Sequence, residues 1–254
     1  MSILKVNQNI EKYPYIKQYY HCYLNQFFKN KHPLADLLSK NDIELEGLEK
    51  CLQKLQTINK LSHLIKKSRN KEDFYSIYSE MKAVISFIQM EIPVDIITDK
   101  KSSPDLIIEI DNCKISCEIK YLKDKLSEKN PYVLSRIDDE VTIKNSIVKS
   151  VKKGQYYNTF PHIFMFYLNW SADDLDFEDT LCSSRDGFFF EKNKNNELVY
   201  GMISGIAVVF EKGSRYHEQE QLIIKRPRIM YFPNPNAKYV IENVNRLGFE
   251  AHAV

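Results

Sequence analysis

Residues 104–120 read PDLIIEIDNCKISCEIK, and this stretch decides the fold. Residues 106–110 and 114–122 are rich in β-branched and other apolar side chains at alternating positions, which is typical of β-strands. The polar pair Asp111-Asn112 between them favours a tight turn. The pattern therefore predicts a β-hairpin centred on this pair.

The position of the turn fixes the register of the hairpin. Residues that face each other have numbers that sum to 223, so Asp105 lies opposite Glu118. Side chains alternate between the two faces of a strand, and direct cross-strand neighbours lie about 4.5–5.5 Å apart. One predicted face is apolar and carries Leu106, Ile108, Ile110, Ile115, Cys117 and Ile119. The other is polar and carries Asp105, Glu109, Lys114, Ser116, Glu118 and Lys120. A slip of one residue would mix the two sets, so the pattern favours this register.

The polar face has two explanations. It could be the solvated side of an antiparallel hairpin, where Lys and Glu are common. Asp105 and Glu118, however, would be like charges side by side, which destabilises a sheet by about 1 kcal/mol or less. A bound cation is a natural reason to retain them. Mg²⁺ fits best, because it takes oxygen ligands and commonly uses one or two carboxylates. The backbone carbonyl of Ile119 is a candidate for a further ligand.

Pro104, Asp105, Glu118 and Lys120, as they stand here, resemble the motif of the PD-(D/E)XK nuclease superfamily. The resemblance implies that Asp105 and Glu118 bind Mg²⁺, with Mn²⁺ as a substitute. It also implies that Lys120 orients or activates the attacking water and stabilises charge at the scissile phosphate. The implied fold is α/β, a restriction-endonuclease-like αβββαβ core with a mixed sheet flanked by helices.

The elements expected around the hairpin occur in that order. Residues 72–90 carry an apolar stripe at helical spacing, and residues 94–98 form a short strand pattern. A second helix is predicted over residues 132–153, and residues 162–170 are nearly continuously apolar, as in a central strand. Glu80 lies at the edge of the stripe on the first helix. The resemblance makes Glu80 a candidate for a further metal or water-binding carboxylate; the alternative is a side chain that reaches solvent or pairs with a lysine.

Basic side chains gather at the end of the second predicted helix, where Lys144, Lys149, Lys152 and Lys153 are followed by Gln155. They could contact a nucleic-acid backbone, since lysines supply affinity that does not depend on sequence. They could equally be a solvated helix end whose cations complement the helix dipole. Only seven of the 36 basic residues are arginine, which suits backbone contacts better than reading of bases.

The composition of the whole chain bounds its class. The 254 residues are 43% hydrophobic, which is ample for a packed core, and their formal net charge is +2. Because the net charge is small, a basic surface must arise from segregation of charge. The glycines form neither a GxxxxGK[ST] nor a GxGxxG arrangement, so a nucleotide-binding loop is not expected.

Cysteine usage and hydropathy indicate the compartment. The five cysteines stand at positions 22, 51, 113, 117 and 182, with no CxxC pair and no histidine at zinc-ligand spacing. This argues for a reducing compartment and against a disulfide framework or a zinc site. We find no signal peptide and no apolar run of the roughly 20 residues that a membrane helix needs. We therefore expect a cytoplasmic protein with no membrane contact.

Two domains are predicted, an N-terminal helical extension over residues 1–70 and a PD-(D/E)XK nuclease-like α/β domain over residues 71–254. The extension has apolar helical stripes; it could form a homodimer, contact DNA or cap the sheet. Beyond the core, residues 200–211 and 222–232 have strand patterns, and residues 237–247 are predicted to form a last helix that ends at Gly248.

The expected function is that of a Mg²⁺-dependent endodeoxyribonuclease, similar to bacterial restriction, repair or defence nucleases. Asp105, Glu118 and Lys120 are its predicted catalytic residues, and DNA is its predicted partner. The alternative is a catalytically inactive protein of the same fold that acts as a nucleic-acid-binding or assembly subunit.

Overall fold

The computed structural model describes residues 3–40, 42, 44–98, 103–122, 136–157, 159–168, 181–182, 187–210 and 228–251, with backbone alone for residues 3, 136–141, 210, 228 and 250–251. Residues 132–135, 169–170, 211 and 222–227 of the predicted elements lie outside this set. The chain divides into two compact units, Met1–Ser86 and Phe87–Val254. The predicted boundary after residue 70 lies within the first unit, and as a domain assignment it stays a prediction.

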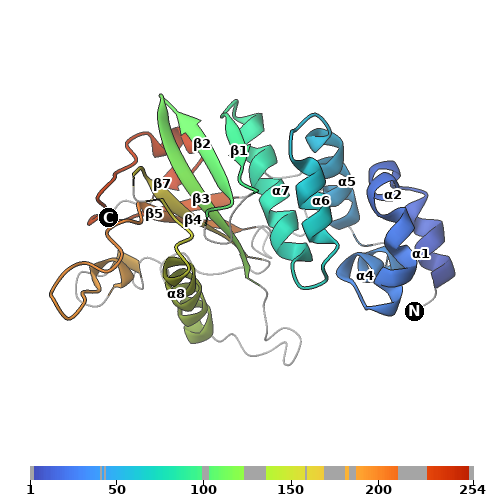
Figure 1. Cartoon of the computed structure of the whole chain (residues 1–254), viewed down its shortest axis with the longest axis horizontal. Helices are drawn as coiled ribbons and strands as arrows, with labels where there is room; N and C mark the ends of the chain where they lie inside the picture. Colours follow the sequence, from blue (N-terminus) through green and yellow to red (C-terminus); the bar gives the residue numbers. More distant parts are fainter. Residues whose placement is uncertain are drawn as a thin grey trace, which may run out of the picture. The chain divides into compact units, whose positions relative to one another are not determined.

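The first unit is helical, as its apolar stripes predict (Figure 1). Its elements are α1 (Ile3–Ile10), α2 (Pro14–Tyr20), the 3₁₀ helix η1 (His21–Tyr23), α3 (Leu24–Lys29), α4 (Pro33–Lys40), α5 (Glu44–Leu55) and α6 (Leu61–Ser68). The helix α7 (Phe74–Gln89) then leads along the chain into the second unit. The long apolar pattern over residues 45–65 forms two helices rather than one, because Lys60 takes a left-handed backbone conformation at φ 77° before α6 begins.

A buried histidine joins three of these helices. His32 stacks on Phe27 with ring centroids 4.0 Å apart, and the amide of Leu34 donates to its Nδ1 at 3.1 Å. Its Nε2 lies 3.0 Å from the carbonyl oxygen of Ser68. Since Nδ1 accepts a hydrogen bond, Nε2 carries the proton and donates to Ser68. The ring therefore links the turn between α3 and α4 to the end of α6.

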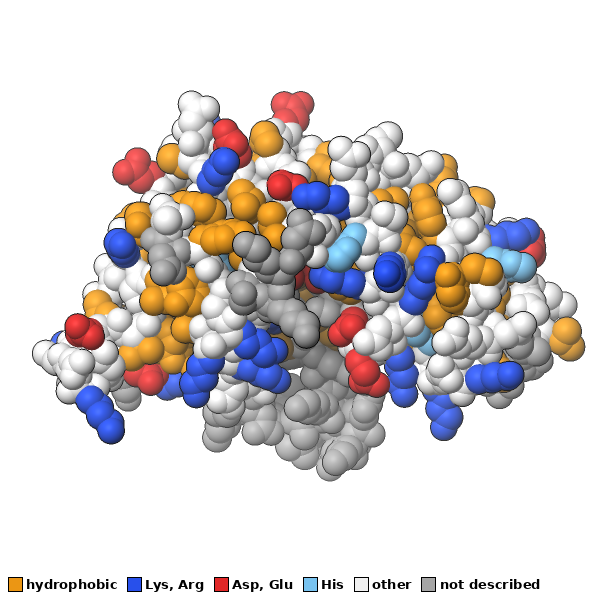
Figure 2. Space-filling model, in the orientation of Figure 1, with side chains coloured by type: hydrophobic (Ala, Val, Ile, Leu, Met, Phe, Trp, Pro, Cys, Tyr) orange, Lys and Arg blue, Asp and Glu red, His pale blue; other side chains and the backbone are white. Residues whose placement is uncertain are grey.

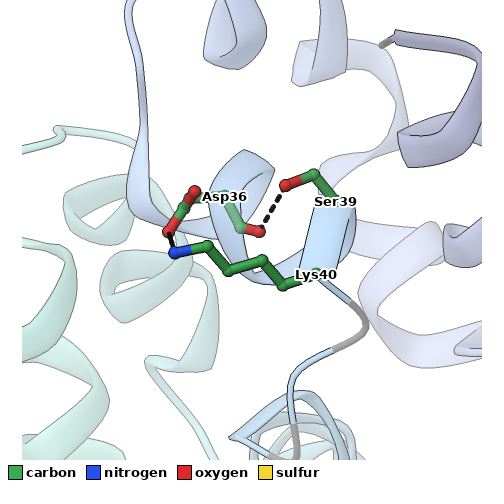
Figure 3. A network of polar contacts seen from close by, with 3 residues as sticks. All are labelled: Asp36, Ser39 and Lys40. Atoms are coloured by element: carbon green, nitrogen blue, oxygen red, sulfur yellow. Dashed lines mark hydrogen bonds and ion pairs between the residues drawn. The ribbon is translucent and has the colours of Figure 1, made fainter. Parts of the chain in front are cut away.

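The polar surface of α4 is organised locally. Lys40 Nζ pairs with Asp36 Oδ2 at 2.7 Å, one helical turn away, and the Ser39 hydroxyl donates to the carbonyl oxygen of Asp36 at 2.8 Å (Figure 3). The ion pair is exposed to solvent, so it contributes little to stability. The fold of the first unit depends instead on its buried apolar stripes and on His32.

The second unit is α/β, with a mixed sheet flanked by helices. Among the described residues the sheet has seven strands, which lie in chain order: β1 (Val94–Ile96), β2 (Leu106–Ile110), β3 (Cys113–Leu122), β4 (His162–Leu168), β5 (Gly205–Phe210), β6 (Arg228–Pro233) and β7 (Glu250–Ala251). The pairs β1–β2, β2–β3 and β5–β6 are antiparallel, whereas β3–β4, β4–β5 and β6–β7 are parallel. The predicted order of helix, three strands, helix and strand is thus present.

The helix α8 (Arg136–Lys152) connects β3 to β4 and covers one face of the sheet (Figure 1). Ile143 and Ile147 of α8 pack in one buried cluster with Phe164 and Phe166 of β4. The cluster continues over β5 and β6 and includes Phe188 of the 3₁₀ helix η2 (Phe188–Phe190). All seven residues of β4 are buried, which confirms the prediction of a central strand for residues 162–168.

The last predicted helix, over residues 237–247, is wrong. The segment consists of turns and ends in the 3₁₀ helix η4 (Val244–Leu247), after which Gly248 is left-handed at φ 68°. Two tertiary hydrogen bonds explain the difference. The amide of Lys238 donates to the carbonyl oxygen of Gly201 at 2.6 Å, and the Ser204 hydroxyl donates to the carbonyl oxygen of Tyr239 at 2.6 Å. The first bond ties the start of the segment to Gly201, and the second uses the carbonyl of Tyr239, which a helix would need for itself.

Candidate active site

The hairpin of β2 and β3 has the predicted register. Leu106 pairs with Cys117 and Glu109 with Lys114, so every pair sums to 223. Asp111 and Asn112 form the turn with φ angles of 51° and 63°, which two-residue hairpin turns favour and which Asp and Asn tolerate. The pairing ends at Leu106, and Asp105, one residue before it, lies close enough to Glu118 for its charge to raise the pKa of that carboxyl group. Cys117 and Ile119 are buried on the apolar face, as predicted.

Asp105 is held in place by the backbone of both neighbouring strands. The amide of Ile119 donates to its carboxylate Oδ2 at 2.8 Å. Its own amide donates to the carbonyl oxygen of Cys117 at 3.1 Å, and its carbonyl oxygen accepts from Ile97 at 2.9 Å. A hydrogen bond to a charged acceptor is stronger than a neutral one, so the amide of Ile119 orients this carboxylate.

Glu118 is a fully buried carboxyl group with 0% exposure. One of its oxygens, Oε1, accepts a hydrogen bond from Lys120 Nζ. The other oxygen, Oε2, has no hydrogen-bond partner among the described residues. Burial, and after it the charge of Asp105, raises the pKa of Glu118 to about 8, although Lys120 acts in the opposite direction. In the metal-free protein this carboxyl group is therefore largely protonated at neutral pH.

The polar face of the hairpin is solvated only in part. Glu109 and Lys114 near the turn are exposed, whereas Ser116 and Glu118 are buried. The explanation that the whole face is the solvated side of a hairpin is therefore wrong. The reason is the parallel strand β4, which places Phe164 next to Glu118 on the face that α8 covers.

Lys120 connects this buried site to solvent. Its side chain is 23% exposed, while its ammonium group contacts the buried Glu118. The two residues lie two apart on β3 and so share a face. A cation in this position can contact an anionic substrate from the solvent side without losing its carboxylate partner.

A second polar pair beside the site, Ser116 and His162, was not predicted from the sequence. The parallel register aligns them, and Ser116 Oγ lies 2.8 Å from His162 Nδ1. Burial, and after it the charge of Lys120, lowers the pKa of His162 to about 3, so the ring is neutral. Its Nε2 has no hydrogen-bond partner among the described residues. His162 begins an apolar run, and only the pairing of β3 with β4 brings it to Ser116.

Two carboxylates fit a divalent cation at this position. Oε2 of Glu118, which receives no donor from the described residues, lies near Asp105, and Mg²⁺ commonly takes one or two carboxylates and completes its shell with water and phosphate. Glu80 is buried at 4% exposure, so it does not reach solvent. Within the described part of the chain, no three His, Cys, Asp or Glu side chains form a ready metal-binding group. Glu80 and the carbonyl of Ile119 therefore stay predicted ligands.

The basic residues of α8 have different surroundings. Lys144 forms an ion pair of 3.0 Å with Glu191, whereas Lys149, Lys152 and Lys153 are exposed. Gln155 is half-buried, and its backbone amide donates to the carbonyl oxygen of Ser150 at 3.1 Å. Figure 2 shows Lys and Arg side chains interspersed with Asp and Glu on the face in view. Nucleic-acid binding by these five residues stays a prediction.

Comparison of the chain with protein-family models, with curated proteins and with solved structures gave no significant match. Within the described ranges, no helix combines the length and apolar character that crossing a bilayer requires.

Proposed function

We propose that the chain is a Mg²⁺-dependent nuclease with a restriction-endonuclease-like core, and that it hydrolyses phosphodiester bonds of DNA. One observation carries this proposal. The buried Glu118, whose Oε2 receives no donor from the described residues, lies near the oriented Asp105 and accepts a hydrogen bond from Lys120. The order of α7, β1, β2, β3, α8 and β4, with β4 parallel to β3, supports the same assignment.

The energetics of the site favour a cation over an empty pair of acids. A buried carboxylate is costly unless it is paired or bound to metal. The raised pKa of Glu118 expresses this cost, since the metal-free protein retains a proton instead of a second negative charge. A divalent ion would displace that proton and satisfy Oε2. When bound, such an ion lowers the pKa of a coordinated water and stabilises charge on the phosphate.

The residues of the chain have separate roles in this mechanism. Asp105 and Glu118 hold the site at a separation that the strand pairing fixes. Lys120 adds positive charge where the scissile phosphate develops negative charge, and it orients the nucleophilic water. The neutral Ser116–His162 pair fills the adjacent buried volume without adding charge. The lysines at the end of α8 are predicted to contact the nucleic-acid backbone.

Cleavage assays with three variants test the proposal. Supercoiled plasmid, single-stranded DNA and RNA are incubated with Mg²⁺, Mn²⁺ or EDTA and with the wild type, Asp105→Asn, Glu118→Gln or Lys120→Ala. We expect metal-dependent cleavage of DNA by the wild type alone. If no protein cleaves with either ion while all bind DNA equally, the chain is a non-catalytic nucleic-acid-binding subunit and the proposal fails.

A further inference from the structure

Charge is segregated between the two units. Residues 1–86 contain 14 Lys and Arg against nine Asp and Glu, a formal charge of +5, whereas residues 87–254 contain 22 against 25, a formal charge of −3. The unit that holds Asp105 and Glu118 thus has an excess of acid. Long-range attraction for a polyanionic substrate must come mainly from the helical unit.

The cations of the helical unit gather around one hydrogen bond. The bond from His32 to the carbonyl oxygen of Ser68 joins the α3–α4 turn to the end of α6, and Tyr20 OH lies 2.7 Å from Ser68 Oγ beside it. Within three residues of either His32 or Ser68 the chain has no Asp or Glu. The same windows contain six cations, which we call the basic cluster: Lys29, Lys31, Lys66, Lys67, Arg69 and Lys71.

The basic cluster is accessible and not neutralised. Within the described residues, none of its six side chains forms an ion pair with an acid. Four of them, Lys29, Lys31, Lys66 and Lys71, are exposed. The guanidinium of Arg69 lies 4.0 Å from the ring centroid of Tyr23, which fixes its position. Lys71 is close enough to His32 for its charge to help lower the pKa of that ring, after the larger effect of burial.

One cation of the cluster has an uncommon backbone conformation, which Lys60 and Glu91 outside the cluster also have. Lys31 has a φ of 54°, in the left-handed region where Gly or Asn is favoured. A lysine there has a conformational cost that a glycine would avoid. The cost is understandable if the positive charge between α3 and α4 has a use.

We propose that the basic cluster binds the phosphate backbone of a nucleic acid. Five lysines and one arginine suit phosphates, which accept point charges, better than base edges, which select bidentate arginines. Each neutralised phosphate releases counterions, so binding depends steeply on salt. The inference extends the proposed nuclease function, but binding at the cluster needs neither the metal nor Asp105 and Glu118.

A binding assay without metal tests the cluster directly. Fluorescence anisotropy of a labelled 30-base-pair duplex is measured in EDTA over a range of salt concentrations. The test variant Lys29→Gln/Lys66→Gln/Lys71→Gln removes three exposed cations of the cluster. The control Lys12→Gln/Lys50→Gln/Lys54→Gln removes three exposed lysines elsewhere in the same unit, so both proteins change net charge equally. Far-UV circular dichroism checks that each variant keeps its helices.

The cluster variant should bind at least about tenfold more weakly at 100 mM salt, and its slope of log affinity against log salt should fall by about 2–3. The control should change affinity by less than about twofold. Equal weakening of both variants, or of neither, would overturn the assignment.

Two further arms separate this inference from others. The wild type should bind the duplex in EDTA, where it does not cleave. A failed cleavage assay therefore does not affect the binding result, and a failed binding assay does not affect the cleavage result. Poly-L-glutamate serves as an acidic polypeptide probe. If it competes with the duplex as strongly as unlabelled DNA at equal charge, the cluster is a site for acidic proteins and the proposal is wrong.

Discussion

The backbone amide of Ile119 donates a hydrogen bond of 2.8 Å to Oδ2 of Asp105, across the boundary between two strands. Through this bond, the strand that carries Glu118 also orients the opposite carboxylate. Asp105 directly precedes β2, and its backbone bonds to Cys117 and Ile97 tie it to both adjacent chain segments.

The first prediction concerns the charge of Asp105. Asp105→Asn keeps an oxygen that can accept from Ile119 but removes the negative charge that a cation needs. We expect DNA cleavage to fall by at least about 100-fold. The free energy of unfolding should change by less than about 1 kcal/mol, because the hydrogen bond persists. Initial cleavage rates and urea unfolding measure the two effects, and wild-type cleavage by this variant would exclude Asp105 as a ligand.

The second prediction concerns pH and Glu118 in the metal-free protein. Its pKa is about 8 in the folded state, against a usual value of 4.5, so between these values the folded protein binds more protons than the unfolded chain. The contribution of Glu118 to stability is then lost as the pH rises through this window. In EDTA, Glu118→Gln should gain a few kcal/mol relative to the wild type from pH 5 to pH 8. Urea unfolding at several pH values checks this, and a constant difference would contradict it.

The third prediction concerns His32 in the helical unit, whose contribution to stability depends on pH in the opposite direction to that of Glu118. Burial lowers the pKa of His32 to about 4 from 6.5, so the unfolded chain binds more protons between these values. The stability contribution of the neutral ring is lost as the pH falls from 6.5 towards 4. His32→Gln should lack this acid sensitivity, and its deficit against the wild type should shrink by up to about 3 kcal/mol at pH 4. Helical circular dichroism during acid titration gives the comparison; parallel curves would refute the role of His32.

The fourth prediction concerns packing on the sheet face opposite α8. A Cβ added at Gly205 of β5 would overlap the ring of Tyr231, whose hydroxyl donates to the carbonyl oxygen of Ser204 at 3.0 Å. Tyr231 also stacks on Phe249, with ring centroids 5.6 Å apart, so it cannot easily move. Gly205→Ala should destabilise the protein by about 1–3 kcal/mol.

The matched control for this packing prediction is Gly201→Ala. The nearest atom to an added Cβ at Gly201 is the carbonyl oxygen of Asn236 at 3.5 Å, an ordinary contact. Its cost should stay below about 1 kcal/mol. Thermal unfolding measures the stability of both variants. Equal melting temperatures would show that the ring of Tyr231 moves to accommodate the added methyl group.

Local physics made the hairpin predictable from the sequence. The turn at Asp111-Asn112 and the alternation of apolar residues around it involve contacts close in the chain, and together they specify one register. The same alternation places Glu118 and Lys120 on one face. The residues of the candidate site on this hairpin could thus be predicted because they lie within 16 positions of one another in the sequence.

Tertiary contacts determine the features that could not be predicted from the sequence. Ser116 meets His162 only because β3 and β4 pair in parallel, and α8 separates these strands in the chain. Burial of Glu118 has the same origin. The predicted helix at residues 237–247 fails for a related reason, since Lys238 and Tyr239 hydrogen-bond to Gly201 and Ser204. No periodicity in the sequence reports bonds of this kind.

The most direct test of the metal site is anomalous diffraction from crystals grown with Mn²⁺. We expect one strong anomalous peak within about 2.0–2.3 Å of carboxylate oxygens of both Asp105 and Glu118, and loss of that peak in Glu118→Gln. A manganese ion bound elsewhere, with Glu118 Oε2 still facing only protein, would contradict it.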